Sequence, residues 1–119
     1  MSFRDILKTS VDAVDGGLAS VVMGFDGISV EEYVKNGSAV DVQTLGVEYS
    51  SALTEVRRTA DALKSGTVQE VSVVTEGAVV LLRPVNAEYF VALVIAADGN
   101  FGKGRYILRR AAQAIALEM

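Results

Sequence analysis

Residues 22–33 have the sequence Val22-Met23-Gly24-Phe25-Asp26-Gly27-Ile28-Ser29-Val30-Glu31-Glu32-Tyr33. The central Asp-Gly pair predicts a two-residue type I′ turn between antiparallel strands, because both residues tolerate positive φ. Such a turn sets the register, which pairs Phe25 with Ile28, Met23 with Val30, and Val21 with Glu32. Alternation along the strands then places Phe25, Ile28, Met23 and Val30 on one face. The stretch therefore predicts a β-hairpin with one apolar face.

Helical and strand-like patterns follow one another along the rest of the chain. Apolar residues recur at helical spacing over 3–14 and 42–63, and Ser2 and Asp41 are suitable N-caps. Gly66 is expected to end the long second helix as its C′ residue. Strands are predicted at 67–75, 78–83 and 89–97, followed by a last helix at about 102–118. The predicted order is α-β-β-α-β-β-β-α.

The five predicted strands fit one antiparallel sheet. The most apolar runs, at 18–25, 78–82 and 89–97, should lie in the middle, where both faces are covered. This arrangement gives the strand order 2-1-5-4-3. We therefore predict an α+β sandwich, formed by a single domain over residues 1–119.

Composition excludes several functional classes. The chain has no cysteine and no histidine, so disulfides, thiolate metal sites and histidine-based catalysis lack their usual groups. We predict no metal site and no cofactor. A net charge of −4 disfavours nucleic acid as a partner. The N-terminus lacks a signal-peptide pattern and no apolar run reaches the ~20 residues that span a bilayer, so we expect a cytoplasmic protein without membrane contact.

The two predicted edge strands differ in character. The first edge carries Glu31, Glu32 and Lys35, charges that discourage further strand pairing. The other contains Val71-Ser72-Val73-Val74-Thr75, without lysine, proline or glycine. These five residues are predicted to form a dimer interface, by antiparallel pairing with a second copy about a twofold axis. The alternative is that a loop covers this edge.

Two groups of polar residues near the last helix could carry chemistry. The turn Asp98-Gly99-Asn100-Phe101-Gly102-Lys103-Gly104-Arg105 precedes a helix, whose N-terminus attracts anions, but it matches no phosphate-binding motif. A strand-to-helix turn that needs small residues is the alternative. The basic group Arg105, Arg109 and Arg110 is interpreted as a solvated face, or as ion pairs with Glu118 and its neighbours, rather than a binding site.

Neither mid-helix arginines nor adjacent glutamates suggest catalysis. Arg57 or Arg58 could assist phosphoryl transfer in a partner GTPase, but such arginines usually come from loops, so a surface role is favoured. Glu31 and Glu32 are neighbours on a strand and point to opposite faces. They cannot converge as an acid–base pair. We predict no catalytic residue and no enzymatic activity.

The order of elements, the Asp-Gly hairpin and the 98–105 turn together resemble the Roadblock/LC7 family over essentially the whole chain. The segment Gly24-Phe25-Asp26-Gly27-Ile28-Ser29-Val30-Glu31 is similar to bacterial MglB-type members, especially a short gliding-motility paralogue. The resemblance implies a homodimer with a continuous sheet. The long helices of the two copies would lie together on one face, with Leu53 and Val56 at the interface, and the first and last helices on the other.

The resemblance also implies a function. Family members act as platforms for Ras-like small GTPases and assemble with one another, so the expected role is a non-catalytic scaffold or regulator in bacterial polarity or gliding motility. Unlike the longer MglB-type regulators, the chain is expected to lack an extension after its last helix, which places direct GTPase activation in doubt. A second Roadblock protein of MglB type, or a polarity response regulator, is an equal candidate partner. Ligand-binding sensor and motor-associated light chain are the alternatives.

Two surfaces are candidates for partner contact. One is the exposed side of the long helix, with Glu48, Arg57 and Arg58. The other is the hairpin tip, where Phe25 and Ile28 form an apolar pair beside the charge of Asp26. Alternatively, Phe25 and Ile28 cap the core beneath the helices.

Overall fold

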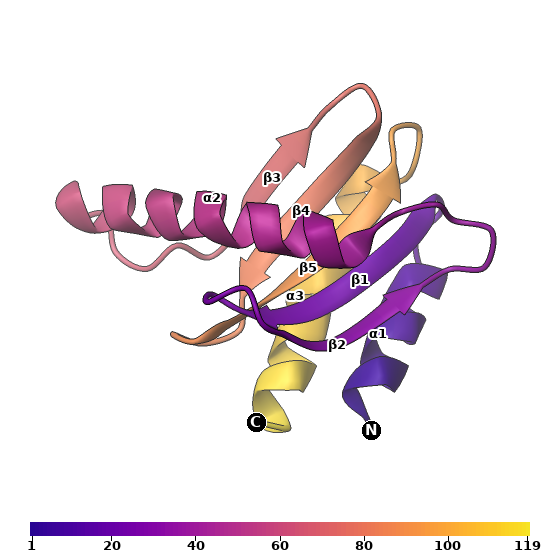
Figure 1. The fold of residues 1–119 in the computed structure, drawn as a ribbon, viewed down its shortest axis with the longest axis horizontal. Helices are drawn as coiled ribbons and strands as arrows, with labels where there is room; N and C mark the ends of the chain where they lie inside the picture. The colour runs from indigo at the N-terminus through magenta and orange to yellow at the C-terminus, as the bar shows by residue number, and fades with distance from the viewer.

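The computed structural model describes all 119 residues and has a five-stranded antiparallel sheet with helices on both faces (Figure 1). Its elements are α1 (Phe3–Asp12), β1 (Gly17–Gly24), β2 (Ser29–Val34), α2 (Val42–Ala62), β3 (Val71–Val74), β4 (Ala78–Pro84), β5 (Tyr89–Ala96) and α3 (Phe101–Leu117). The strand order is β2-β1-β5-β4-β3, which confirms the prediction. Only β3 is much shorter than predicted, since residues 67–70 lie outside it.

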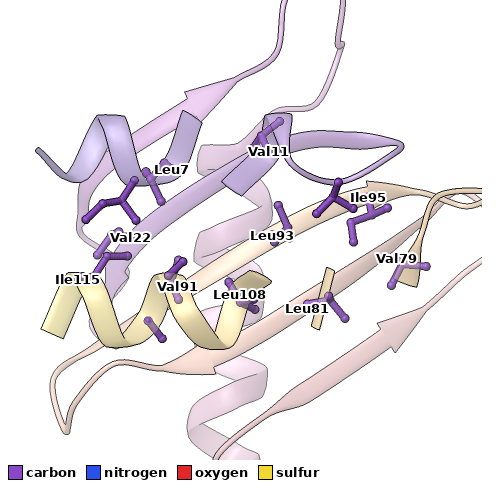
Figure 2. Packing of buried hydrophobic residues seen from close by; sticks show 14 residues of the cluster. Leu7, Val11, Val22, Val79, Leu81, Val91, Leu93, Ile95, Leu108 and Ile115 are labelled. Carbon is purple, nitrogen blue, oxygen red and sulfur yellow. The ribbon is translucent and has the colours of Figure 1, made fainter. Parts of the chain in front are cut away.

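The sheet separates two hydrophobic cores, because alternate side chains of its central strands point to opposite faces. On β5, Val91, Leu93 and Ile95 pack beneath α1 and α3 (Figure 2). Phe90, Ala92 and Val94 pack on the α2 face. The three central strands are therefore buried on both faces, as their apolar sequences predicted.

Helix ends follow local capping chemistry, with one correction. The side chains of Ser2 and Asp41 accept hydrogen bonds from the backbone N–H groups of Asp5 and Thr44, as N-caps do. At the other end of α2 the prediction for Gly66 was wrong. Leu63 is the C-cap, and Lys64 directly after it has a φ of 55°, so Lys64 takes the left-handed position.

The hairpin departs from the predicted type I′ turn. Gly27 alone has positive φ, and its N–H donates to the Gly24 carbonyl at 2.9 Å, so the turn has Phe25 and Asp26 at its centre. Val21 does oppose Glu32, but Met23 opposes Ser29 rather than Val30. Val30 is thus the extra residue of a bulge, and the predicted single apolar face is wrong.

Helix α2 covers the sheet with its first half only. Val42, Gly46, Ser50 and Leu53 are its buried residues, and a Cβ at Gly46 would lie 2.7 Å from Met23 Cε. Glycine therefore lets the helix approach β1 closely. The second half projects past β3 (Figure 1), and Leu63 near its end is 71% exposed.

Candidate protein-binding surfaces

Phe25 lies at the centre of the first surface, between an aromatic ring and a cation. Its ring centroid is 5.4 Å from that of Phe90 in the α2-side core. On another side, the guanidinium carbon of Arg57 lies 3.8 Å from the Phe25 ring centroid, a cation–π contact. Phe25 is half-buried as a result. Phe25 is neither fully in the core nor fully exposed at the hairpin tip, so the core-capping interpretation holds for it only in part, and partner contact stays a prediction.

Three hydrogen bonds, each with at least one backbone partner, fix this arrangement. Phe25 N–H donates to the Glu88 carbonyl at 3.0 Å, which ties the hairpin to the β4–β5 turn. Arg57 Nη2 donates to the Ala87 carbonyl of the same turn at 3.2 Å. Asp26 Oδ1 accepts the Ile28 N–H at 3.0 Å and stiffens the hairpin loop. The middle of α2, the β1–β2 hairpin loop and the β4–β5 turn therefore meet at Phe25.

The exposed part of this surface combines an apolar and an acidic group. Ile28 is 67% exposed, and Asp26 is also exposed. A shallow pocket of about 250 Å³ beside them is lined by Gly24, Phe25, Asp26, Glu88 and Tyr89. We call Phe25, Asp26, Ile28 and Arg57 the hairpin-tip surface. The aromatic ring of Phe25 is held in place, while the side chain of Ile28 and the second carboxylate oxygen of Asp26 are free to contact another molecule.

The other two helix residues predicted for partner contact do not join this surface. Arg58 Nε donates to Glu55 at 3.0 Å, which raises the pKa of Arg58 and lowers that of Glu55 through their hydrogen bond and charge. Glu48 is exposed but lies on roughly the opposite side of α2 from Arg57, since each residue turns a helix by about 100°. The spacing of nine residues already separates Glu48 from Arg57 on a helix, so the sequence did not support grouping the two as one surface.

A second surface is formed by β3 and the projecting half of α2. The outer edge of β3 has no neighbouring strand, and Val74 on it is 69% exposed. Val56 and Leu63 on α2 are 40% and 71% exposed and line an apolar groove of about 500 Å³. We call Val56, Leu63 and residues 71–75 the seam surface. Leu63 could not be recognised from the sequence as a surface residue, because it continues the apolar stripe of α2.

The residues predicted for the dimer interface divide into exposed and buried groups. Ser72 and Thr75 are exposed like Val74, whereas Val71 and Val73 are half-buried against the α2-side core. Leu53 is only 1% exposed and belongs to that core. Leu53 therefore stabilises the chain itself and offers no surface to a second copy.

The glycine-rich turn before α3 is explained by close packing. A Cβ at Gly99 would lie 2.4 Å from Ile95 Cγ2, and one at Gly104 would lie 2.4 Å from Ile95 Cδ1. Asn100 Oδ1 accepts the Lys103 N–H at 3.1 Å and caps the helix. These contacts favour the strand-to-helix interpretation over a phosphate site.

Within the basic group on α3, Arg105 pairs with Glu70, a residue that the sequence pattern did not single out. Arg105 Nη2 lies 2.6 Å from Glu70 Oε2, and Arg110 Nη1 donates to the Tyr106 hydroxyl at 3.2 Å. Neither arginine contacts Glu118. No group of three or more His, Cys, Asp or Glu side chains is placed to hold a metal ion, and none of the helices is both long and apolar enough to span a membrane.

Comparison with known proteins finds similarity over the full length. The chain is 48% identical to MglC from Myxococcus xanthus, with 100% of both chains covered and a TM-score of 0.74. It also has the fold of a Roadblock/LC7 domain from Streptomyces avermitilis, at 11% identity, TM-score 0.85 and coverage of 97% and 95%. The gliding protein MglB from Thermus thermophilus gives 15% identity, TM-score 0.87 and coverage of 97% and 86%. No protein-family model matches the chain, and no curated protein does.

Proposed function

The chain belongs to the Roadblock/LC7 family, and from this we propose that it is a dimeric, non-catalytic regulator or scaffold in a bacterial Ras-like small-GTPase module. The module would control cell polarity or gliding motility in the cytoplasm. The observation that carries the proposal is the 48% identity to MglC over the whole length of both chains. The chain's partners would be an MglB-type Roadblock protein, the GTPase itself, or a polarity response regulator.

The seam surface supports the dimer. An exposed strand edge without lysine or proline can pair with another chain, and antiparallel pairing with an identical strand generates a closed twofold arrangement. The half of α2 that projects past β3 (Figure 1) exposes Val56 and Leu63, so the helix of a second copy could bury both. Two kinds of association, backbone pairing and apolar burial, are therefore available together.

The hairpin-tip surface supports contact with a different protein. Binding energy at interfaces concentrates in a few residues, and aromatic and arginine side chains are prominent among them. Here Phe25 and Arg57 are held in place before any partner binds, at a centroid distance of 3.8 Å. A pre-ordered site loses less entropy on binding. Ile28 would insert into an apolar depression of the partner, and Asp26 would contact a basic group beside it.

A non-catalytic role fits the chemistry of these surfaces. The hairpin-tip surface contains one carboxylate and one guanidinium, without a nucleophile and base in contact. Regulation would then come from binding, by holding a partner in one conformation or by joining two partners. Arg57 donates to Ala87 and stacks on Phe25, so it acts as a structural support rather than as a group inserted into a GTPase site.

The test is binding of the purified chain to a purified MglB-type protein and to the GTP-loaded GTPase, measured by calorimetry. Ile28→Ala should weaken binding by roughly tenfold, the effect of removing one well-buried interface side chain. Leu117→Ala is the matched control, because Leu117 is 86% exposed on α3 at the other face of the sheet. Phe25→Ala combined with Asp26→Ala should weaken binding further while the dimer remains folded by circular dichroism. Wild-type protein that binds neither candidate would contradict the proposal.

A further inference from the structure

A polar pocket opens where the segment before β3, the end of β4 and one side of α3 meet. Its volume is about 380 Å³, and it is lined by Gln69, Glu70, Arg83, Arg105, Tyr106 and Arg109. Three arginines face a single glutamate, so the pocket has a surplus of positive charge in a chain whose net charge is −4. Neither the hairpin-tip surface nor the seam surface includes any of these residues.

Glu70 is shared between two guanidinium groups. Arg83 Nη1 lies 3.4 Å from Glu70 Oε1, and Arg105 Nη2 lies 2.6 Å from Oε2. The side chains of Glu70 and Arg83 are 17% and 18% exposed, so this part of the cluster is largely shielded from solvent. A guanidinium has five N–H donors, and one carboxylate cannot satisfy two such groups. Donors on the pocket side of both arginines therefore remain available to another acceptor.

Arg109 has no acidic partner in the chain. All five ion pairs of the structure involve other residues. Its guanidinium carbon lies 6.0 Å from the ring centroid of Tyr106, which is itself 49% exposed. Since Arg105 and Arg109 are four residues apart, they lie one turn apart on the same side of α3. The pocket therefore presents two successive cations beside an exposed aromatic ring.

We propose that this pocket binds an acidic peptide segment of a protein partner, with separate carboxylates on Arg105 and Arg109. A compact dianion such as phosphate fits less well, because Glu70 already occupies the space between Arg83 and Arg105 and would repel it. Carboxylates spaced along a peptide can reach the outer donors of both arginines without meeting Glu70, and each such bond is charge-assisted. The ring of Tyr106 would pack against the aliphatic part of the acidic side chains of the bound segment. All the lining residues come from one chain, so the inference depends on neither the dimer nor the hairpin-tip partner.

The test is fluorescence anisotropy with a labelled hexaglutamate peptide, with hexaglutamine and inorganic phosphate as competitors. Hexaglutamate should bind and lose affinity as salt rises, and neither competitor should displace it at equal concentration. Arg109→Gln should weaken binding by roughly tenfold, the effect of losing one bond to a charged group. Arg110→Gln is the matched control, because Arg110 lies outside this pocket and contacts Tyr106 from the α1 side. It should leave the affinity unchanged.

Glu70→Gln provides a test of opposite sign. Removing the competing carboxylate should tighten peptide binding by about threefold, an effect that a merely structural role of Glu70 would not produce. If this variant does not fold by circular dichroism, the pair Arg109→Gln and Arg110→Gln decides alone. Equal weakening by those two variants, displacement by phosphate, or no binding of hexaglutamate would overturn the proposal.

Discussion

The hairpin-tip surface and the seam surface are both apolar at their centres but are held in different ways. At the tip, Phe25 is fixed by Phe90, by Arg57 and by a backbone hydrogen bond, so the free chain already has an ordered site. At the seam, Leu63 and Val74 are exposed, without a polar or aromatic support. The tip is thus complete within one chain, whereas the seam needs a second surface to bury it. This difference suits the tip to an exchangeable partner and the seam to lasting self-association.

The strongest test of this difference places charge on the seam. Leu63→Glu together with Val74→Glu should weaken self-association by at least about 100-fold, because each unpaired carboxylate that the dimer buries costs several kcal/mol. Sedimentation velocity over a concentration series measures the effect. Both residues are exposed in the single chain, so the variant should keep its fold.

Ile28→Glu is the control for that experiment, because it adds the same charge at the tip. It should remain dimeric and lose only binding to the other partner. A seam variant that sediments as the wild type does would show that the chain associates through another surface, or not at all.

The second test concerns how the tip is ordered. A double-mutant cycle with Phe25→Leu and Arg57→Gln, read as free energies of unfolding in urea, should give a coupling of about 0.5–1 kcal/mol for a partly exposed cation–π pair. The matched cycle of Phe25→Leu with Arg58→Gln should give none, since Arg58 pairs with Glu55. Equal coupling in both cycles would mean that the Phe25–Arg57 contact does not order the tip.

The sequence predicted those features that depend on neighbours along the chain. The apolar runs of β1, β4 and β5 predicted the strand order, and Ser2 and Asp41 predicted two helix starts. Each of these inferences needs only local capping chemistry or the number of apolar faces that a strand must bury. The prediction of the turn type failed because an Asp-Gly pair fits two hairpin geometries, and here the loop is the longer one, with a bulge at Val30.

Contacts between distant segments could not be predicted. Glu70 and Arg105 pair although they are 35 residues apart in the sequence. No local pattern marks a glutamate in the segment between α2 and β3 as the partner of an arginine on α3. Leu53 and Val56 are neighbours on α2, yet one is 1% and the other 40% exposed. That difference depends on where the helix leaves the sheet (Figure 1). The site residues were therefore recognisable by type, while their grouping into a tip, a seam and a pocket required the fold.

The smallest expected effect separates stability from both binding surfaces. Helix α2 carries Arg57 to the tip and Leu63 to the seam, and Asp41 caps its opposite end. The pKa of Asp41 is lowered, first by the hydrogen bond from the Thr44 backbone N–H and then by that from the Thr44 hydroxyl. A carboxyl whose pKa falls on folding stabilises the fold above its ordinary value of 3.8, and the stabilisation is lost as pH falls through the lowered value.

Asp41→Ala should therefore lower the melting temperature slightly at pH 7, and its difference from wild type should shrink as the pH is lowered past 3.8. Asp41→Asn should keep most of the stability at pH 7, because asparagine also caps helices, but without this pH dependence. Calorimetry across pH measures all three proteins. Dimerisation and partner binding at pH 7 should be the same in all of them, because the cap lies in the first turn of α2, far along the helix from Arg57 and Leu63. A loss of either by Asp41→Ala in still-folded protein would show that the start of α2 belongs to a binding surface, and that the tip and the seam are not independent of it.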